Sequence, residues 1–309
     1  MNYYSLFHFT IASSIKFDVL RSISKPDKLD VFIETGTLSN VPESEIGWHN
    51  FGNCKYNKEN CFFELPEDNS KFLIEKCKSH IKVVIDFKDP EYRQTLLSYF
   101  FASGLSAIIH FQGLFLLHSS GVSKGNGLIL FCGPSGIGKS TIAAHLKTKG
   151  YPLFTDDKCL LIPSGNGKWT ALPGLNIMRL WQNSIDALDT STFLHNPKEV
   201  ELKKDKFQFY IKSQELISEE KHVKAIFIIQ NLKKGERIGN QELQGLNKIK
   251  KIKSQIFRVN MVSGMGLDQK LWTFLTNILN DIPVYSLQRP LGTSIDNFGE
   301  YVEEMIDKL

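Results

Sequence analysis

The pattern of hydrophobic and polar positions changes near residue 90. Before that point, short apolar segments are separated by turn-rich segments, which predicts strands at residues 5–11, 30–34, 61–65 and 82–87. We therefore expect a small β-rich N-terminal module over residues 1–90 and a second, larger domain over residues 91–309. The first 20 residues lack the basic region and the cleavage site of a signal peptide, and they fit a strand better.

A long segment without charge follows this change. Residues 94–123 contain no charged side chain, and residues 96–117 are long enough to span a bilayer. Several serines, His110 and Gln112 interrupt the apolar positions. We therefore expect a buried helix over residues 90–110, a buried strand over residues 114–118 and a turn over residues 121–127, with no membrane as partner.

Strands and helices alternate in the second domain. We expect a strand at residues 128–132, a helix at residues 139–147 and a strand at residues 151–155. Later strands are expected at residues 160–163, 223–230 and 284–287, followed by a C-terminal helix at residues 295–308. This alternation predicts an α/β fold.

Composition narrows the classes of protein without naming one. The 309 residues are 42% hydrophobic and 23% charged, which excludes a disordered, collagen-like or coiled-coil chain. The net charge of +4 gives no reason to expect a nucleic acid as partner. Basic residues are concentrated in residues 198–258, which favours either a solvated face or a landing surface for an acidic partner or peptide. Within it, residues 248–253 fit an amphipathic turn of helix.

The 5 cysteines favour reduced thiols in a cytoplasmic protein, because their number is odd and their density is low. A zinc set could be drawn from three of them and one histidine. Only Cys77 and His80 have the tight spacing of zinc ligands, whereas Cys54 and Cys61 are too far apart for the usual knuckle. Free cysteines are the favoured interpretation.

One motif carries chemistry. Residues 133–140 read Gly-Pro-Ser-Gly-Ile-Gly-Lys-Ser and match G-x-x-x-x-G-K-[ST] between an expected strand and an expected helix. Its glycines let backbone N–H groups point at phosphate oxygens, and the start of the helix favours an anion. Lys139 would place its charge on the β- and γ-phosphates of a nucleotide, and Ser140 could ligate Mg²⁺. The expected phosphate-binding residues are Gly133, Pro134, Ser135, Gly136, Ile137, Gly138, Lys139, Ser140 and Thr141.

Two aspartates end the strand that follows the helix of this motif. A parallel pairing of that strand with residues 128–132 would bring Asp156 and Asp157 beside the phosphates. Mg²⁺ prefers one or two carboxylates together with phosphate oxygens, and a hydroxyl nucleophile needs a proton acceptor. Two adjacent acids can divide these duties. The alternative is an acidic turn after a strand.

His118 is a third candidate, fifteen residues before Gly133. If its strand pairs with residues 128–132, His118 lies near the γ-phosphate; the alternative is a hydrogen-bonded structural histidine.

A motor or switch NTPase should carry, besides the glycine-rich loop, a later strand that ends in aspartate. Residues 223–230 end in Gln230, and residues 83–86, Val-Val-Ile-Asp, precede the loop. This arrangement favours a small kinase over a motor.

Taken together, these residues resemble the HPr kinase/phosphorylase superfamily, and more narrowly the HPr-kinase-related proteins encoded with peptide natural products, including the lasso-peptide kinases. The resemblance is carried by His118, by residues 133–140 and by Thr155-Asp156-Asp157. Residues 172–181 also resemble the Pro-Gly…Arg-Leu segment of the related subgroup. The resemblance covers residues 114–182, with a weaker match at residues 284–290.

This resemblance implies a P-loop core of the PEP-carboxykinase type that transfers the γ-phosphate of ATP, or of another nucleoside triphosphate, with Mg²⁺ to a serine of a peptide or small protein. It implies that one of Asp156 and Asp157, with Asp157 preferred, takes the proton of the serine while the other helps Ser140 to hold the metal. His118 and Lys139 would act at the transferred phosphate. Arg179 would bind phosphate or a substrate carboxylate, or serve only in packing.

The same resemblance leaves two points open. A ribosomally made precursor peptide is a substrate that the resemblance alone suggests. Relatives can be oligomeric, so a homo-oligomer stays open. The later catalytic arginine of the family has no clear match, and we leave its two candidates, Arg258 and Arg289, out of the expected site.

The chain also departs from the family. Bifunctional members carry Glu-x-Arg-Gly after the aspartates, whereas residues 171–174 read Ala-Leu-Pro-Gly here. A metal-binding glutamate is therefore missing, which argues against dephosphorylating activity and against HPr as the substrate. Two other functions stay open: a kinase for a small molecule such as an amino acid or sugar, and a nucleotide-sensing binding module. An enclosed pocket beside Asp157 would favour the first, and ATP binding without turnover the second.

Overall fold

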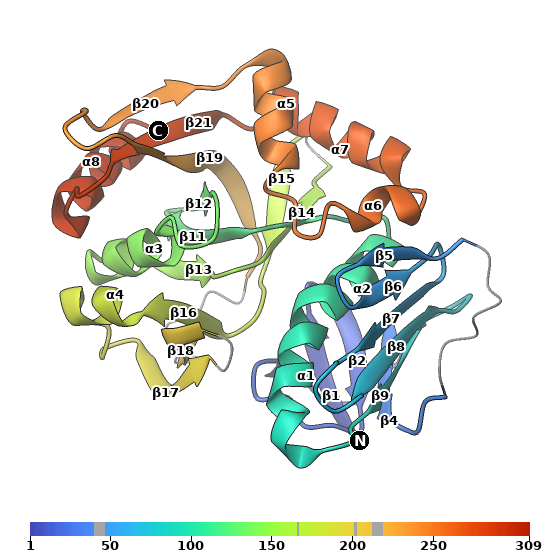
Figure 1. Ribbon diagram of the computed structural model, residues 1–309. Coiled ribbons are helices and arrows are strands. Elements are labelled where there is room, and N and C mark those ends of the chain that lie inside the picture. The colour runs from blue at the N-terminus through green and yellow to red at the C-terminus, as the bar shows by residue number, and fades with distance from the viewer. Residues whose placement is uncertain (40–46, 166, 201–202, 212–218) are drawn as a thin grey trace. The chain divides into compact units, whose positions relative to one another are not determined.

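The computed structural model describes residues 1–39, 47–165, 167–200, 203–211 and 219–309 (Figure 1). The chain divides into two compact units, and each takes in two parts of the sequence. Unit 1 comprises Met1–Phe115 and Phe257–Thr273, and unit 2 comprises Leu116–Ile256 and Phe274–Leu309. The boundary expected at residue 90 lies inside unit 1.

Unit 1 is built on a 9-stranded sheet with the order β3-β1-β2-β4-β9-β8-β7-β6-β5. Three of the four expected strands are confirmed. The one expected at residues 5–11 is wrong, because Phe7 and His8 adopt left-handed backbone angles and turn the chain into a hairpin. The strands are β1 (Asn2–Leu6), β2 (Phe9–Ser13), β3 (Arg21–Ser22), β4 (Val31–Thr35), β5 (His49–Phe51), β6 (Cys54–Tyr56), β7 (Asn60–Glu64), β8 (Lys71–Lys76) and β9 (Ile81–Asp86).

The helix expected over residues 90–110 is confirmed, and it belongs to unit 1. It consists of η1 (Pro90–Tyr92), α1 (Arg93–Tyr99), the π-helical segment η2 (Phe100–Gly104) and α2 (Leu105–Phe111). Two aromatic contacts attach it to the sheet. The ring of Tyr99 lies 4.7 Å from that of Phe63, and the ring of Phe100 lies 5.6 Å from that of Phe72. This packing is why the division falls after the helix.

The central sheet of unit 2 has the order β10-β14-β15-β19-β12-β11-β13. The end of β19 also pairs with β21, which pairs with β20. The expected strands at residues 128–132, 160–163, 223–230 and 284–287 are confirmed. The strands are β10 (Leu116–Leu117), β11 (Ser119–Lys124), β12 (Gly127–Cys132), β13 (Leu153–Thr155), β14 (Cys159–Pro163), β15 (Trp169–Leu172), β19 (Lys221–Leu232), β20 (Gly239–Glu242) and β21 (Val284–Pro290).

The turn expected at residues 121–127 is wrong. Most of that segment belongs to β11, which pairs antiparallel with both β12 and β13. Its serines and Gly121 look like a turn in the sequence, but Ser119–Ser123 of the strand are buried. Gly121 has no room for a side chain, since a Cβ there would lie 2.7 Å from Leu130. Cross-strand pairing therefore overrides the local preference.

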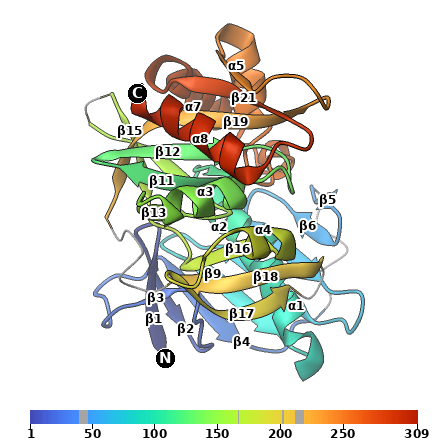
Figure 2. The ribbon, with the colours of Figure 1, turned by 90° about the vertical axis from the view of Figure 1, so that its left-hand side faces the viewer.

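Helices and a second, smaller sheet complete unit 2. The expected helices at residues 139–147 and 295–308 are confirmed as α3 (Lys139–Thr148) and α8 (Ile295–Asp307), which lie side by side (Figure 2). The small sheet has the order β16-β18-β17, with β16 (Ile177–Trp181), β17 (Leu194–Val200) and β18 (Lys203–Ile211). The other helices are α4 (Gln182–Ala187), α5 (Gly245–Lys253) and, in unit 1, α6 (Met261–Gly264), while α7 (Asp268–Asp281) runs from unit 1 into unit 2.

The glycine-rich segment lies at the carboxyl ends of the parallel strands in the central sheet of unit 2. Strands β12, β19 and β21 run parallel, so their carboxyl ends meet at the same edge. Ile129 and Phe131 of β12, Phe227 of β19, Ile142 of α3 and Phe298 of α8 share one apolar cluster. The expected α/β class is confirmed. Among the described residues, no helix has the length and apolar character needed to cross a bilayer.

Candidate active site

The glycine-rich segment forms the connection between β12 and α3. Gly133, Gly136 and Gly138 adopt φ values of 141°, 84° and 106°, which other residues rarely adopt. A Cβ at Gly133 would lie 3.0 Å from the carbonyl oxygen of Ile229, so this position also has little room for a side chain. Gly138 precedes α3, and no side chain caps the first N–H groups of the helix. These N–H groups can bind an anion.

Ile137 and Lys139 hold the loop against the rest of unit 2. Ile137 belongs to the apolar cluster of unit 2. Lys139 is only 6% exposed, and its Nζ donates to the carbonyl oxygens of Gly133 at 2.9 Å and Pro134 at 3.1 Å. The ammonium group therefore lies inside the curve of the loop, where a phosphate can replace these carbonyls as its partner.

The paired aspartates lie beside this loop, although the expected strand pairing is wrong. Strand β13 pairs with β11 and not with β12, so β11 lies between them. Because β11 is antiparallel to both neighbours, β12 and β13 still point the same way. Asp156 and Asp157 therefore follow a strand that ends at the edge where the loop begins.

The two carboxylates have different surroundings. Asp156 is 2% exposed, and both of its oxygens are used within the protein. Oδ1 accepts from the hydroxyl of Ser120 at 2.5 Å, and Oδ2 accepts from the backbone N–H of Arg179 at 2.9 Å. Asp156 therefore joins β11 to β16 and positions its neighbours.

Asp157 instead faces cationic side chains. Its Oδ2 contacts Lys158 Nζ and lies 3.4 Å from Arg179 Nη1, while its Oδ1 lies 3.5 Å from His118 Nε2. Burial alone would raise the pKa of Asp157. The charge of Lys158, the hydrogen bond from His118 and the charge of Arg179 outweigh burial and hold this pKa well below its usual range. The carboxylate is thus ionised at neutral pH.

His118 reaches the site by a route that the sequence did not reveal. The strand expected at residues 114–118 is shorter, and β10 pairs with β14 and not with β12. The next strand, β11, begins at Ser119, which pairs with Cys132 just before the loop. His118 therefore lies just before the β11–β12 hairpin, and this position places it beside Asp157.

Arg179 is attached to both aspartates. Its backbone N–H binds Asp156, and its Nη1 approaches Asp157. The rest of its guanidinium donates to Oε1 of Gln208, from Nε at 3.1 Å and from Nη2 at 2.9 Å. Arg179 thus lies at the smaller cavity, between Asp157 and Gln208.

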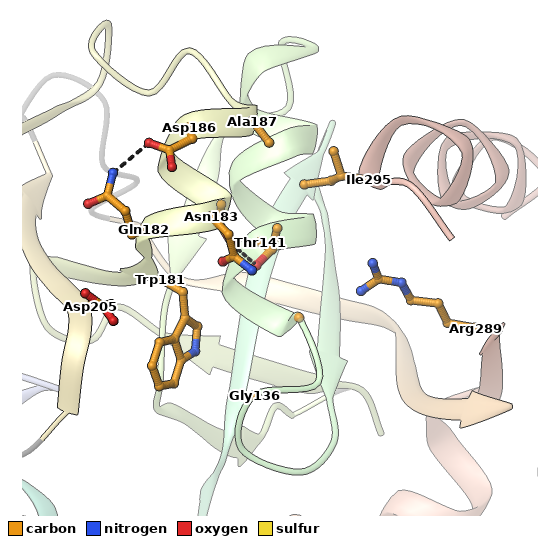
Figure 3. A pocket seen from close by; sticks show the side chains of 12 residues that line it. Gly136, Thr141, Trp181, Gln182, Asn183, Asp186, Ala187, Asp205, Arg289 and Ile295 are labelled. Carbon is orange, nitrogen blue, oxygen red and sulfur yellow. Dashed lines mark hydrogen bonds between the residues drawn. The ribbon is translucent and has the colours of Figure 1, made fainter. Parts of the chain in front are cut away.

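Two neighbouring cavities meet at the loop. The smaller has a volume of about 40 Å³, and its lining includes His118, Lys139, Ser140, Asp157 and Arg179. The larger has a volume of about 820 Å³ and is bounded by α4, the start of α8 and the end of β21 (Figure 3). The residues that line both are Gly136, Gly138, Thr141 and Trp181.

The residues present fit a nucleotide with Mg²⁺. The uncapped start of α3 and the ammonium group of Lys139 suit phosphate oxygens. Ser140 and Asp157 line the same small cavity, and a hydroxyl and a carboxylate are suitable Mg²⁺ ligands when phosphates complete the shell. The hydroxyl oxygens of Thr141 and Ser184 lie 2.9 Å apart, and this hydrogen bond joins α3 to α4 at the larger cavity.

The described residues contain no cluster of three or more His, Cys, Asp and Glu side chains that could hold a metal by itself. The zinc set is therefore not formed. Cys54 and Cys61 are buried with their Sγ atoms 3.2 Å apart, whereas Cys77 is exposed. Burial raises the pKa of Cys132 to about 12, so that thiol is unreactive.

Sequence reasoning missed three residues of the site. Lys158 directly follows the aspartates, is 2% exposed and contacts Asp157. Trp181 lines both cavities. Arg289 lies near the carboxyl end of the parallel strand β21, at the same edge as the loop, and lines the larger cavity, with its guanidinium 5.2 Å from the ring of Phe298. Arg258, the other arginine left out, lies in unit 1.

Comparisons with known proteins add little to this geometry. No family model matches the chain, and no curated protein matches it. Among solved structures, the chain is similar to the HPr(Ser) kinase/phosphatase from Coxiella burnetii, with 11% sequence identity. The match covers 62% of this chain and 88% of that chain, with a TM-score of 0.34. A similarity at this level carries no argument about the site, so the proposals below rest on the described residues.

Proposed function

We propose that this protein is a P-loop kinase of the HPr-kinase-like, PEP-carboxykinase type, which transfers the γ-phosphate of ATP, with Mg²⁺, to a serine of a peptide or small protein. One observation carries the proposal. An ionised carboxylate, Asp157, shares a small cavity with the glycine-rich loop, Lys139 and Ser140. Phosphoryl transfer to a hydroxyl needs a phosphate cradle, a cation on the phosphates and a proton acceptor, all within one space.

The larger cavity supplies room for the rest of the donor. Its volume of about 820 Å³ lies within the range of small-molecule sites, and it opens beside Gly136 and Gly138. A nucleoside would lie between Trp181 on one side and Arg289 and Ile295 on the other (Figure 3). Its phosphates would then reach the loop and the smaller cavity.

The side chains of the smaller cavity divide the work of transfer. Asp157 accepts the proton of the serine hydroxyl as the serine oxygen bonds to the γ-phosphorus and the bond to the β-phosphate oxygen breaks. Lys139 and the loop N–H groups hold the charge that develops on the phosphates. Ser140 and Asp157 would hold Mg²⁺, which would neutralise phosphate charge. Lys158 and Arg179 keep Asp157 ionised, and His118 orients its Oδ1.

The volume of the smaller cavity supports a peptide acceptor over a free sugar or amino acid. About 40 Å³ holds only a few water-sized groups. A single hydroxyl carried on a longer chain needs only this much space beside Asp157. That this peptide is a precursor of ribosomal origin rests on the family resemblance alone.

The test is the transfer of labelled γ-phosphate from ATP and Mg²⁺ into the peptide fraction of an extract of the source cell. Lys139→Ala should abolish the labelled peptide, because it removes the cation that holds the phosphates. Lys149→Ala, at the exposed end of the same helix, should leave the label unchanged. Label found only in small metabolites would favour the small-molecule kinase. Intact ATP binding without any transfer would favour the binding module.

A further inference from the structure

The small sheet β16-β18-β17 has one apolar face and one polar face. Met178 and Leu180 of β16 and Phe209 of β18 belong to the apolar cluster of unit 2. Side chains of a strand alternate between faces, and directly paired residues share a face. Arg179 pairs with Gln208, and Trp181 pairs with Lys206, so these four side chains lie on the polar face.

The third strand of the small sheet, β17, pairs with β18 (Figure 2). Gln208 also pairs with Lys198 of β17, so Arg179, Gln208 and Lys198 form one row across all three strands. Tyr210, two residues after Gln208 on β18, completes the same face. We call these six residues the cationic face: Arg179, Trp181, Lys198, Lys206, Gln208 and Tyr210.

Cations and aromatic rings are paired on this face. The Nζ of Lys206 lies 5.5 Å from the ring centre of Trp181, and the Nζ of Lys198 lies 5.8 Å from that of Tyr210. The described part of these strands carries two carboxylates, Glu199 and Asp205, and Asp205 shares the larger cavity with Trp181 of the face. Glu199 pairs with Phe207, which packs against the apolar cluster, and Asp205 lines the larger cavity. The face thus carries three cationic side chains, Arg179, Lys198 and Lys206, and Arg179 contacts the carboxylate of Asp157.

One end of the cationic face is the site of transfer. Arg179 approaches Asp157, and both Arg179 and Lys206 line the smaller cavity with the loop. At the strand spacing of about 4.8 Å, the backbone of Lys198 lies about 10 Å from that of Arg179. An extended chain covers this distance in about three residues.

We propose that the cationic face binds an acidic segment of the acceptor peptide, whose serine then lies at Asp157. This inference rests on the proposed function and names the chemistry of its substrate. Carboxylates about three residues from the serine would lie at Lys198, and closer ones at Lys206 and Arg179. A single-stranded nucleic acid could also use cations and rings, but a proton acceptor beside the face favours a chain that carries a hydroxyl to be modified.

The test uses short synthetic peptides that share one serine and differ only in the flanking positions, with glutamate, glutamine or lysine about three residues to either side. Binding is measured by fluorescence anisotropy without nucleotide, and phosphorylation with ATP and Mg²⁺. The glutamate peptide should bind about tenfold more tightly than the glutamine peptide at low salt, and the difference should shrink as ionic strength rises.

A charge reversal then assigns the preference to the face. Lys198→Glu should raise the KM for the glutamate peptide about three- to tenfold with little change in kcat. Lys250→Glu, an exposed change on α5, should leave KM unchanged and serves as the matched control. ATP binding by both variants should equal that of the wild type, because neither residue lines a cavity of the site.

The outcomes separate this inference from the proposed function. Phosphorylation of all three peptides with equal KM would overturn the acidic segment and leave the kinase intact. Glutamate-dependent binding that Lys198→Glu abolishes would support the cationic face even if no peptide were phosphorylated, a result that would count against the kinase. A single-stranded oligonucleotide that displaces the glutamate peptide at a lower concentration than the unlabelled peptide would also overturn the inference.

Discussion

Asp86 in unit 1 and Asp157 in unit 2 invite comparison, because each lies at or just after the end of an apolar strand and near lysine side chains. Burial would raise the pKa of Asp86, but a hydrogen bond from Lys88 and another from the backbone of Leu38 lower it. The pKa of Asp157 is lowered in a similar way by Lys158, His118 and Arg179. Electrostatics alone therefore does not distinguish the two carboxylates.

What differs is the space in front of each carboxylate. Asp86 Oδ2 accepts from Lys88 Nζ at 2.7 Å and from Leu38 N at 2.9 Å, and these contacts close a turn of unit 1. Asp157 faces a cavity that it shares with the loop and Lys139. A lowered pKa marks a well-partnered carboxylate, and only an adjoining phosphate cradle makes it a candidate for catalysis.

The largest expected effect on stability compares Asp156 with Asp86, two buried carboxylates that accept backbone hydrogen bonds. Asp156→Ala leaves the buried Ser120 hydroxyl and Arg179 N–H without their acceptor, so we expect it to lower the free energy of unfolding by about 3 kcal/mol. Transfer should also fall, because Arg179 and Asp157 lose their positions. Asp86→Ala should cost about 2 kcal/mol and leave transfer unchanged.

Urea unfolding and steady-state transfer check this pair. Equal transfer by Asp156→Ala and the wild type would show that Asp156 does not position the site. A loss of transfer in folded Asp86→Ala would remove the distinction between the two units.

A smaller effect, on kcat, is expected from replacing His118. His118→Gln removes the contact with Asp157 Oδ1 and should lower kcat about tenfold, because the base is less well oriented. His80→Gln, a change at a partly exposed position in unit 1, should leave kcat unchanged. Steady-state kinetics with a common peptide measures both. A His118→Gln enzyme with the wild-type kcat would return His118 to a structural role.

The smallest effect concerns pH. Folding lowers the pKa of both Asp86 and Asp157, so their contributions to stability are complete above the pKa of an unfolded aspartate, about 3.9, and are lost as pH falls through the folded pKa. The free energy of unfolding should therefore decrease as the solution is acidified below about pH 4. Asp157→Asn and Asp86→Asn should each flatten this decrease, with the larger flattening in Asp157→Asn. Urea titrations at several pH values measure it.

The sequence allowed much of the site to be predicted because its signals are local. The loop, the helix after it and the two adjacent aspartates lie within 25 residues, as residues 133–157. A glycine-rich turn between a strand and a helix has few conformations, so its pattern is specific. The α/β alternation of residues 128–155 was predictable for the same reason.

The remainder depended on pairing between distant segments. Strand β11 has serines and a glycine where a strand usually has branched side chains, and only its neighbours β12 and β13 make it a strand. The contacts of Arg179 with Gln208 and of Asp156 with Ser120 join strands far apart in the chain. No local pattern in the sequence indicated that Phe257–Thr273 belongs to unit 1.

The most direct measurement of the central claim compares Asp157→Asn with Asp86→Asn in a single-turnover transfer from ATP and Mg²⁺ to a serine peptide, with ATP affinity determined on the same samples. We predict that Asp157→Asn binds ATP within about threefold of the wild type but transfers phosphate about a thousandfold more slowly, because the proton acceptor is lost. Asp86→Asn should match the wild type in both. Transfer by Asp157→Asn within tenfold of the wild type would contradict the assignment of Asp157 as the catalytic base.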